Sequence, residues 1–480
     1  MAIDPVRSTE VHFERHLSAK AGIAYANQQI AKYTHSSRPE VRNVRQNWIF
    51  AFFHNALGVP HAAGVLALFF ALACTELRAS PVAGDTRLEQ LLTEAERTNP
   101  DIEAARREVD AVRSRIAPAS ALDDPMLEAG VLNVPVPSLS LNKEDMTMKM
   151  VGVTQRLPYP GKRALRSGVA EKEAEAATDN LHEVVNRVRR DIKVAYLDLS
   201  QVDESTRLVE KNKRILEQFL SIAEARYAVG QASQADVLKA QTQLSKMIDE
   251  AIKLGRERPV IEAELNRALG RVGAPEPAST TPPRVSDVVL RLDELQDMAR
   301  SNRPQLLSQQ RMIERGEKAL DLARKDYYPD FDVRLSYGQR DNYQDVRRDD
   351  MVSLTVAINL PMWRESKRDP RVAEAQALRG QAERMYEARL NETSAMLRQQ
   401  VATAEQSLKS VRLYETAILP QARLAVDAAL AAYKVNRVDF FTLLDDQMTV
   451  LNYEIAYVAN VVSRNKALAE IEFLVGKKLF

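Results

Sequence analysis

The chain has 480 residues, of which 45% are hydrophobic and 28% are charged, and its formal net charge is +1. This balance leaves no basic surface for nucleic acid, so we expect no nucleic-acid partner. No apolar run approaches 18 residues, which excludes membrane-spanning helices.

The N-terminal residues predict export. Residues 62–73 form an apolar run that follows Arg42 and Arg45 and is too short to span a membrane as a helix. Such a run is typical of a secretory signal peptide, which we place at residues 42–73. We expect residues 1–41 to be a non-native or disordered extension, because they lie upstream of any normal leader. Residues 74–86 would then be the N-terminal segment of the mature chain.

Cys74 is the single cysteine of the chain and directly follows the predicted cleavage site. The residues before it, Ala71-Leu72-Ala73, form a loose version of the motif that precedes acylated cysteines. We therefore predict that Cys74 is a lipidation site. The alternative is an unmodified thiol.

The rest of the chain repeats itself. The stretch Arg87–Ile102 recurs about 200 residues later as Arg291–Leu306, and the same order of elements follows in both halves. Each half is expected to contain a helix, a strand, a loop, a second strand, a very long helix, a tight turn and a returning helix. We predict two repeats, 87–270 and 291–480, joined by a linker at 271–290.

Each repeat contains two amphipathic strands. Apolar and polar residues alternate over 331–338 and again over 351–360, and the loop between them is almost wholly polar. This period of two predicts a β-hairpin. The first repeat has the same pattern less regularly, with predicted strands at 126–133 and 146–155.

Three methionines lie on one face of the predicted strand 146–155. Met146, Met148 and Met150 alternate with Thr147 and Lys149. Thioethers are possible copper ligands, but the polar residues on the opposite side favour a lipid or core position for the methionines. We expect these three side chains to face lipid.

Four such strands are long enough to cross a bilayer when tilted, but too few to close a barrel. Because open sheet edges are not tolerated in hydrocarbon, a membrane position requires several chains to pool their hairpins, and three chains would give twelve strands. The alternative is a small water-soluble sheet packed on helices.

Two very long helices are predicted at 162–227 and 367–433. The first has apolar residues at heptad spacing from Val185 to Val202, and the second repeats this spacing from Leu390 to Val411. Pro370 is tolerable in the first turn of the second helix, and Pro420 predicts an interior kink. A helix of this length runs about 100 Å, so it spans a distance or forms part of a tube.

Each long helix ends in a repeated turn. Gly230 and Asn436 occupy equivalent positions in the two turns, and these residue types most readily accept the left-handed conformation that ends a helix. The residues at both turns therefore predict that each long helix and its returning helix form a helical hairpin.

With these features the chain resembles the TolC-like outer-membrane factors of tripartite efflux pumps and type I secretion systems. The resemblance covers residues 87–480 and rests on the duplicated plan, the Val-Gly turn and the stretch Asp236-Val237-Leu238-Lys239-Ala240-Gln241. It implies a mainly α fold with a small β part, in which a homotrimer forms a twelve-stranded outer-membrane β-barrel and a periplasmic α-helical barrel. By position, it implies that the hairpin tips dock a periplasmic adaptor (membrane fusion) protein through Val229, Gly230, Gln231, Val435, Asn436 and Arg437.

The resemblance also implies a periplasmic gate just after the second tip. Asp445 falls on one acidic position of the family, the other position holds Thr442, and Asp446 is the neighbouring substitute. Threefold symmetry would bring copies of Asp445 together, where like charges raise one another's pKa and attract cations. The alternative is that both aspartates are ordinary exposed helix residues.

These expectations together predict a channel rather than an enzyme. The predicted mature chain keeps one histidine, His182, and no cysteine or histidine cluster, so we expect no catalytic residues, metal site or cofactor. We predict the channel of a tripartite efflux system, set in the lipid of a Gram-negative outer membrane and aligned with an inner-membrane RND pump. Residues 123–126, Gly130, Asn133 and residues 155–163 resemble the branch that accompanies heavy-metal cation exporters, which implies a copper, silver or zinc-type cation as cargo. The alternative is a periplasmic coiled-coil adaptor or scaffold without a pore.

Overall fold

The computed structural model describes residues 86–271, 273, 280–286, 288–342 and 346–479. The chain divides into two units, Met1–Pro81 and Val82–Phe480, and all described residues belong to the second unit. The predicted extension, signal peptide and lipidation site at Cys74 lie outside the described residues.

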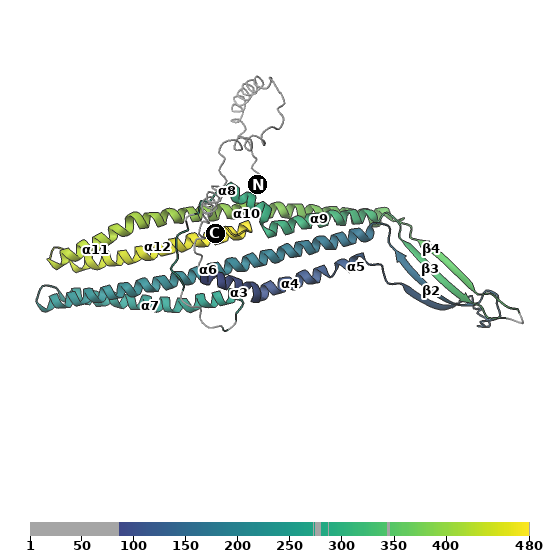
Figure 1. The fold of residues 1–480 in the computed structure, drawn as a ribbon, viewed down its shortest axis with the longest axis horizontal. Coiled ribbons are helices and arrows are strands. Elements are labelled where there is room, and N and C mark those ends of the chain that lie inside the picture. Colours follow the sequence, from purple (N-terminus) through teal and green to yellow (C-terminus); the bar gives the residue numbers. More distant parts are fainter. Residues whose placement is uncertain (1–85, 272, 274–279, 287, 343–345, 480) are drawn as a thin grey trace, which may run out of the picture. The chain divides into compact units, whose positions relative to one another are not determined.

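The second unit consists of helices and one small sheet (Figure 1). The first half contains α3 (Thr86–Thr98), α4 (Pro100–Arg113), α5 (Ile116–Ser120), β1 (Met126–Leu132), β2 (Met148–Leu157), α6 (Lys162–Ala228) and α7 (Gln234–Leu269). The second half contains α8 (Leu292–Asn302), α9 (Pro304–Lys325), β3 (Phe331–Gln339), β4 (Met351–Ile358), the π-helical turn η1 (Arg364–Arg368), α10 (Asp369–Leu413), the π-helical turn η2 (Tyr414–Ile418), α11 (Leu419–Lys434) and α12 (Phe440–Val475). The four predicted strands and both long helical segments are present.

The strands form one antiparallel sheet in the order β1-β2-β3-β4. The hairpins β1–β2 and β3–β4 agree with the predicted strand pairs. Pairing of β2 with β3, which the sequence did not predict, joins the two hairpins into one sheet. Strands β1 and β4 are its two edges, and neither edge has a second strand beside it among the described residues.

The sheet has one apolar and one polar face. Val153 of β2 lies opposite Leu335 of β3, which lies opposite Leu354 of β4, so these side chains share a face. This apolar face is exposed to a large degree, with the side chains of Leu127, Val131, Val151, Val153, Leu335, Tyr337, Val352, Leu354, Val356 and Ile358 all exposed.

The polar face holds a small hydrogen-bonded network. Arg334 of β3 pairs with Glu128 of β1 at 2.5 Å, and the hydroxyl of Thr154 donates to the same carboxylate at 3.2 Å. Met150 lies on this face, because its sulfur is 3.6 Å from Nη2 of Arg334. Met148, two residues earlier on the same strand, lies there too. The expectation that these two methionines lie on the apolar, lipid-facing side of the sheet is therefore wrong.

Four helices continue the order of the strands. Helix α4 packs on α6, α6 on α9, and α9 on α10, so the helices follow the same sequence of neighbours as β1 to β4 (Figure 1). Gly316 allows α9 and α10 to approach closely, since a Cβ there would lie 3.1 Å from the Cα of Arg379. Among the residues that the structure describes, no helix is both long and apolar enough to cross a membrane.

The long helices begin and bend at the residues that the sequence indicated. Gly161, in the left-handed region with φ of 90°, is the N-cap of α6, and Lys162 behind it is buried against Asp330 at 2.9 Å. Pro370 lies in the first turn of α10. Just before Pro420 the helix passes through the π-helical turn η2, and Pro420 lies in the first turn of α11.

The predicted heptad residues form the core of the helical region. Val188, Ile192 and Leu199 of α6 are at most 4% exposed and pack with residues of α3 and α7. A second cluster joins α10 to α8 and α12 through Leu397 and Val401. The residues at heptad spacing therefore pack against other helices of the same chain.

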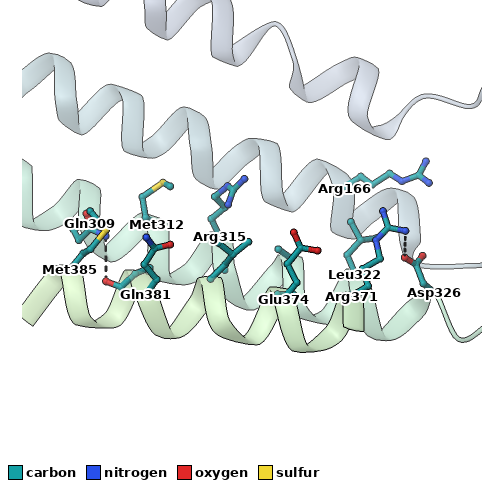
Figure 2. A pocket seen from close by; sticks show the side chains of 16 residues that line it. Arg166, Gln309, Met312, Arg315, Leu322, Asp326, Arg371, Glu374, Gln381 and Met385 are labelled. Carbon is teal, nitrogen blue, oxygen red and sulfur yellow. Dashed lines mark hydrogen bonds and ion pairs between the residues drawn. The ribbon is translucent and has the colours of Figure 1, made fainter. Parts of the chain in front are cut away.

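A groove of about 510 Å³ runs along α6, α9 and α10. Figure 2 shows that Arg166, Arg315 and Arg371 line it together with Glu374 and Asp326. Arg371 pairs with Asp326 at 3.1 Å, and Arg315 pairs with Glu173 at 2.6 Å. The groove also exposes Leu378 and Met385 of α10, which leaves an amphipathic surface on one face of the helices.

Candidate functional site

The candidate site lies at the two helical hairpin turns, α6–α7 and α11–α12. Gly230 has φ of 74° and Asn436 has φ of 61°, so both are left-handed as predicted. The following residue closes each turn in the same way, because the N–H of Gln231 donates to the carbonyl of Arg226 and the N–H of Arg437 to that of Ala432, at 2.8 and 2.9 Å.

The returning helices begin with side-chain caps. Ser233 caps α7 in a reciprocal capping box with Asp236. Asp439 caps α12 and accepts both the backbone N–H and the hydroxyl of Thr442. These hydrogen bonds, chiefly that from the hydroxyl, hold the pKa of Asp439 below its usual value. Thr442, predicted as a gate residue, therefore also has a capping role.

Both turns present exposed valines. Val229 is 67% exposed and Val435 is 63% exposed, at equivalent positions after α6 and α11. Gly230, Gln231, Asn436 and Arg437 are exposed beside them. A valine with most of its surface in water is costly to the isolated chain, since burying such a side chain gains about 1.5–3 kcal/mol. We name the six predicted residues at these turns the docking tips.

Arg226 joins the two tips and was missed by sequence reasoning. It is only 9% exposed, and its guanidinium donates to the carbonyl of Tyr433 and to Oδ1 of Asn436. It also lies 4.5 Å above the Tyr433 ring and 3.4 Å from the carbonyl of Gln231. We name Arg226, Tyr433, Asn436 and Gln231 the tip clamp.

The tip clamp is closed to solvent on the side of Tyr433. The Tyr433 ring packs on Phe440 at 5.2 Å, and its buried hydroxyl has no hydrogen-bond partner among the described residues. Burial raises the pKa of Tyr433. A neutral, desolvated ring strengthens the attraction of the Arg226 cation, because the interaction is stronger away from water.

The predicted gate residues separate into different surroundings. Asp445 is exposed in a groove of about 430 Å³ between α7 and α12, which Lys239 and Lys246 also line. Asp446 is half-buried and does not line that groove. Thr442 is exposed one turn earlier. The two aspartates thus point to different sides of α12.

Polar side chains also hold the two hairpins together above the tips. Asn212 of α6 accepts a hydrogen bond from Gln447 of α12 at 2.8 Å, and both side chains are buried. Further along, Glu454 of α12 accepts from Lys211 of α6 at 3.3 Å and from Arg423 of α11 at 2.7 Å. The contact between α6 and α12 therefore includes partnered polar groups beside a buried apolar cluster.

The acidic groups near the tips do not gather around one point. Among the described residues, no group of three or more histidine, cysteine, aspartate or glutamate side chains is placed to hold a metal ion. The tips can therefore contact a partner through apolar side chains, hydrogen bonds and charged groups.

Two segments of the chain, residues 91–271 and 295–477, match the model of a known family, the outer membrane efflux proteins. Together they cover most of the chain. The chain belongs to the outer membrane efflux protein family.

The relatives agree with this assignment. The cobalt-zinc-cadmium resistance protein CzcC of Cupriavidus metallidurans is 23% identical over 408 residues, which cover 82% of this chain and 91% of CzcC. The crystal structure of CusC matches with a TM-score of 0.70 at 14% identity, covering 82% of this chain and 93% of that one. VceC of Vibrio cholerae matches with a TM-score of 0.68 at 17% identity, covering 82% and 97%.

Membership of this family establishes the functional class of the protein and its cellular location. Outer membrane efflux proteins are channels of the Gram-negative outer membrane that extend into the periplasm, and they are not enzymes. The relatives support the channel and give no support to the alternative of an adaptor or scaffold without a pore.

Proposed function

We propose that three copies of this chain form the outer-membrane conduit of a tripartite efflux system. The sheet is the observation that carries this proposal. Its apolar face is exposed, and its edges β1 and β4 are open within the described part of one chain. Open edges are not tolerated in hydrocarbon, so copies would pair edge to edge, and three four-stranded sheets would close a twelve-stranded barrel.

The helices favour the same arrangement. Because α4 and α10 are the outer members of the row α4-α6-α9-α10, a threefold axis that joins β4 to β1 also brings α10 of one copy to α4 of the next. The row would then close into a periplasmic tube. In this proposal residues 87–270 and 291–480 are the two repeats, and residues 271–290 link them.

The N-terminal segment would bring the chain to this membrane. We propose that residues 42–73 are a cleaved signal peptide, that residues 1–41 are not part of the mature protein, and that the mature chain begins with the segment 74–86. Cys74 would carry the lipid that anchors it. These assignments rest on the apolar run and the single cysteine.

The docking tips would receive a periplasmic adaptor protein. Their exposed valines, one from each turn, supply apolar contacts, and Gln231 and Arg437 supply hydrogen bonds around them. The adaptor would link the channel to an inner-membrane RND pump, which provides the energy for transport.

The periplasmic gate would open by separating the two hairpins. Arg226 holds the tips together, and Thr442, Asp445 and Asp446 lie within the first two turns of α12. When an adaptor takes hold of the tips, the tip clamp would break and the acidic constriction would widen.

The cargo we favour is a heavy-metal cation. CzcC is by name a resistance protein for cobalt, zinc and cadmium, and it aligns with 82% of this chain. An acidic gate suits cations, because carboxylate rings select positive charge.

Conductance of the purified channel in a planar bilayer tests the gate. Replacing Arg226 by methionine keeps an apolar stem but removes the donors to Tyr433 and Asn436. A hydrogen bond from a charged donor contributes about 1.5–3 kcal/mol, so we expect the fraction of open channels to rise at least about tenfold.

The matched control is Lys434→Met, which removes an exposed cation from the same tip. It should leave the closed channel closed. Arg226→Lys should give a partial effect, because an ammonium cannot reproduce the fork of the guanidinium. If Arg226→Met conducts like the parent protein, the tip clamp does not hold the gate.

A further inference from the structure

Three methionines surround one glycine on the polar face of the sheet. Gly338 of β3 lies directly opposite Met150 of β2 and Met351 of β4. The sulfur of Met148 lies 2.6 Å from the position that a Cβ on Gly338 would occupy. Because side chains alternate along a strand and opposed residues share a face, all three thioethers lie on the same side of the sheet.

The glycine makes room for this arrangement. With a side chain at position 338, the sulfur of Met148 would have to move, since it lies 2.6 Å from the Cβ position. Without one, the Met148 thioether bends over the backbone of β3 between the strands that carry Met150 and Met351. Three flexible side chains can therefore reach one point above Gly338.

The surroundings of this point differ from a packed core. Met148 and Met150 are only half-buried, and Met351 is 37% exposed. A charged neighbour is Arg334, whose Nη2 lies 3.6 Å from the Met150 sulfur and which is paired with Glu128 at 2.5 Å. The thioethers are accessible from the polar side, and the neighbouring ion pair has no net charge.

We infer that Met148, Met150 and Met351 bind a soft monovalent metal ion, Cu(I) or Ag(I). Thioether sulfur is a soft, neutral ligand that selects such ions, whereas hard cations prefer oxygen. Binding by three neutral ligands remains exchangeable, as a contact point in a conduit requires. The part that this site plays in export rests on the proposed function, because in the proposed barrel the apolar face would meet lipid and the polar face would line the conduit.

Silver binding to the purified full-length protein in detergent tests the site. Any Cys74 thiol that is not lipidated is first blocked with N-ethylmaleimide, and binding of Ag⁺ is measured by isothermal titration calorimetry. We expect one Ag⁺ per chain, and at least a tenfold loss of affinity in a variant with Met148→Leu, Met150→Leu and Met351→Leu. Leucine conserves volume and apolarity, so this variant should fold.

Two methionine variants serve as controls. Met126→Leu changes the polar face of β1 away from Gly338, and Met385→Leu changes an exposed methionine of α10. Both should bind Ag⁺ like the parent protein, and Zn²⁺ should not compete. In protein labelled with ¹³C at the methionine methyl groups, three resonances should shift on addition of Ag⁺. Replacing Met148, Met150 or Met351 singly by leucine should remove one of these three resonances each time.

Equal Ag⁺ binding by the triple variant, or displacement of Ag⁺ by Zn²⁺, would overturn the inference. The trimer mass and the bilayer conductance of the same preparations separate this failure from failure of the proposed function. A normal channel without methionine-dependent binding refutes the site alone. Methionine-dependent binding in a protein that forms no channel supports the site and refutes its role in export.

Discussion

Two glycines that end the returning helices are fixed by their neighbours as well as by their backbone. Gly270 follows α7 and Gly476 follows α12, each with φ of 74°. A Cβ on Gly476 would lie 2.5 Å from the carbonyl oxygen of Asn302, and one on Gly270 would lie 2.4 Å from Cδ of Pro100. Each returning helix thus ends against the turn that opens its own half, which accounts for the recurrence of Asn-Pro and Asn-Arg-Pro in the sequence.

This contact can be separated from backbone strain by comparing two alanine variants. Gly476→Ala combines the left-handed backbone with a collision against Asn302, while Gly230→Ala has the same φ of 74° and open space around its Cβ. The left-handed conformation costs about 1–2 kcal/mol, and the collision adds about 1–3 kcal/mol. We expect Gly476→Ala to lower the melting temperature, followed by circular dichroism, clearly more than Gly230→Ala. Equal shifts would mean that the contact at Asn302 relaxes without cost.

A buried ion pair joins the two halves. Arg303, between α8 and α9, lies 3.5 Å from Glu183 of α6, and the Glu183 carboxylate also accepts the N–H of Gln305 at 3.3 Å. Burial raises the pKa of Glu183 despite the neighbouring guanidinium, and burial lowers the pKa of Arg303. For both groups, the free energy lost by removing the charge from water therefore exceeds the free energy gained from the ion pair.

The sign of this shift gives a pH dependence. Because the folded pKa of Glu183 is raised, its stabilising contribution is complete below the unfolded pKa and is lost as pH rises through the folded pKa. The melting temperature of the parent protein relative to Glu183→Gln should therefore fall as pH rises from 4 towards neutrality. Asp439 has a lowered pKa, so its stabilising contribution is lost as pH falls through the folded pKa. The melting temperature of the parent protein relative to Asp439→Asn should therefore increase as pH rises through the acidic range. If the difference in melting temperature between the parent protein and Glu183→Gln does not change with pH, burial does not raise the pKa of Glu183.

At the scale of single residues, the sequence predicted those positions whose role is local. Left-handed Gly230 and Asn436 follow from residue type and repeat position, and the structure confirms them. Arg226 was not predicted, because its partners Tyr433 and Asn436 are distant in sequence and arginine in the last turn of a helix has an ordinary explanation. The two halves do not share a signal here, because the position three residues before Val435, equivalent to Arg226, holds Ala432.

At the scale of elements, strand β2 shows where pattern reading fails. Its sequence places methionines at 148 and 150 and valines at 151 and 153, so both faces carry apolar residues and alternation alone does not choose between them. Pairing of Val151 with Tyr337 and of Val153 with Leu335 decides the orientation. Register, which only tertiary structure supplies, puts the methionines on the polar face.

The start of α12 carries a prediction for ion selectivity. Asp445 lies exposed in the groove that Lys239 and Lys246 also line, whereas Asp446 is half-buried outside that groove. A carboxylate about 4 Å from a cation in water contributes about 1 kcal/mol, so we expect Asp445→Asn to lower cation preference by a factor of about 5 in reversal-potential measurements.

Two variants calibrate this measurement. Asp427→Asn removes an exposed carboxylate from α11, outside the proposed gate, and should leave the reversal potential unchanged. Asp446→Asn tests whether the neighbouring aspartate substitutes at the gate. Unchanged selectivity in both gate variants would leave Asp445 and Asp446 as ordinary exposed or half-buried helix residues.

At the scale of the whole molecule, the sequence predicted the elements better than their assembly. The strands, the long helices, both turns and the break at Pro420 follow from local periodicity and from proline and glycine. Pairing of β2 with β3 depends on contacts between the two halves, which no local pattern records. The helix order α4-α6-α9-α10 matches the strand order, since each of these helices lies next to its strand in the chain, α4 by way of α5 and α10 by way of η1.

One chain leaves its sheet incomplete. Every residue of β4 is exposed, and β1 is exposed at all but one position. In water such a sheet would aggregate through its edges and its apolar face. In the proposed trimer, pairing with further copies would satisfy the edges, and lipid would cover the apolar face. The central claim is therefore that the working molecule contains three chains.

Native mass spectrometry of the protein, extracted in detergent from the outer-membrane fraction of a Gram-negative host, tests this claim most directly. Our account predicts a single species of three times the mass of the mature chain, stable until the detergent micelle is removed. A monomer or dimer, or recovery of the protein in the soluble fraction without detergent, would contradict the twelve-stranded conduit.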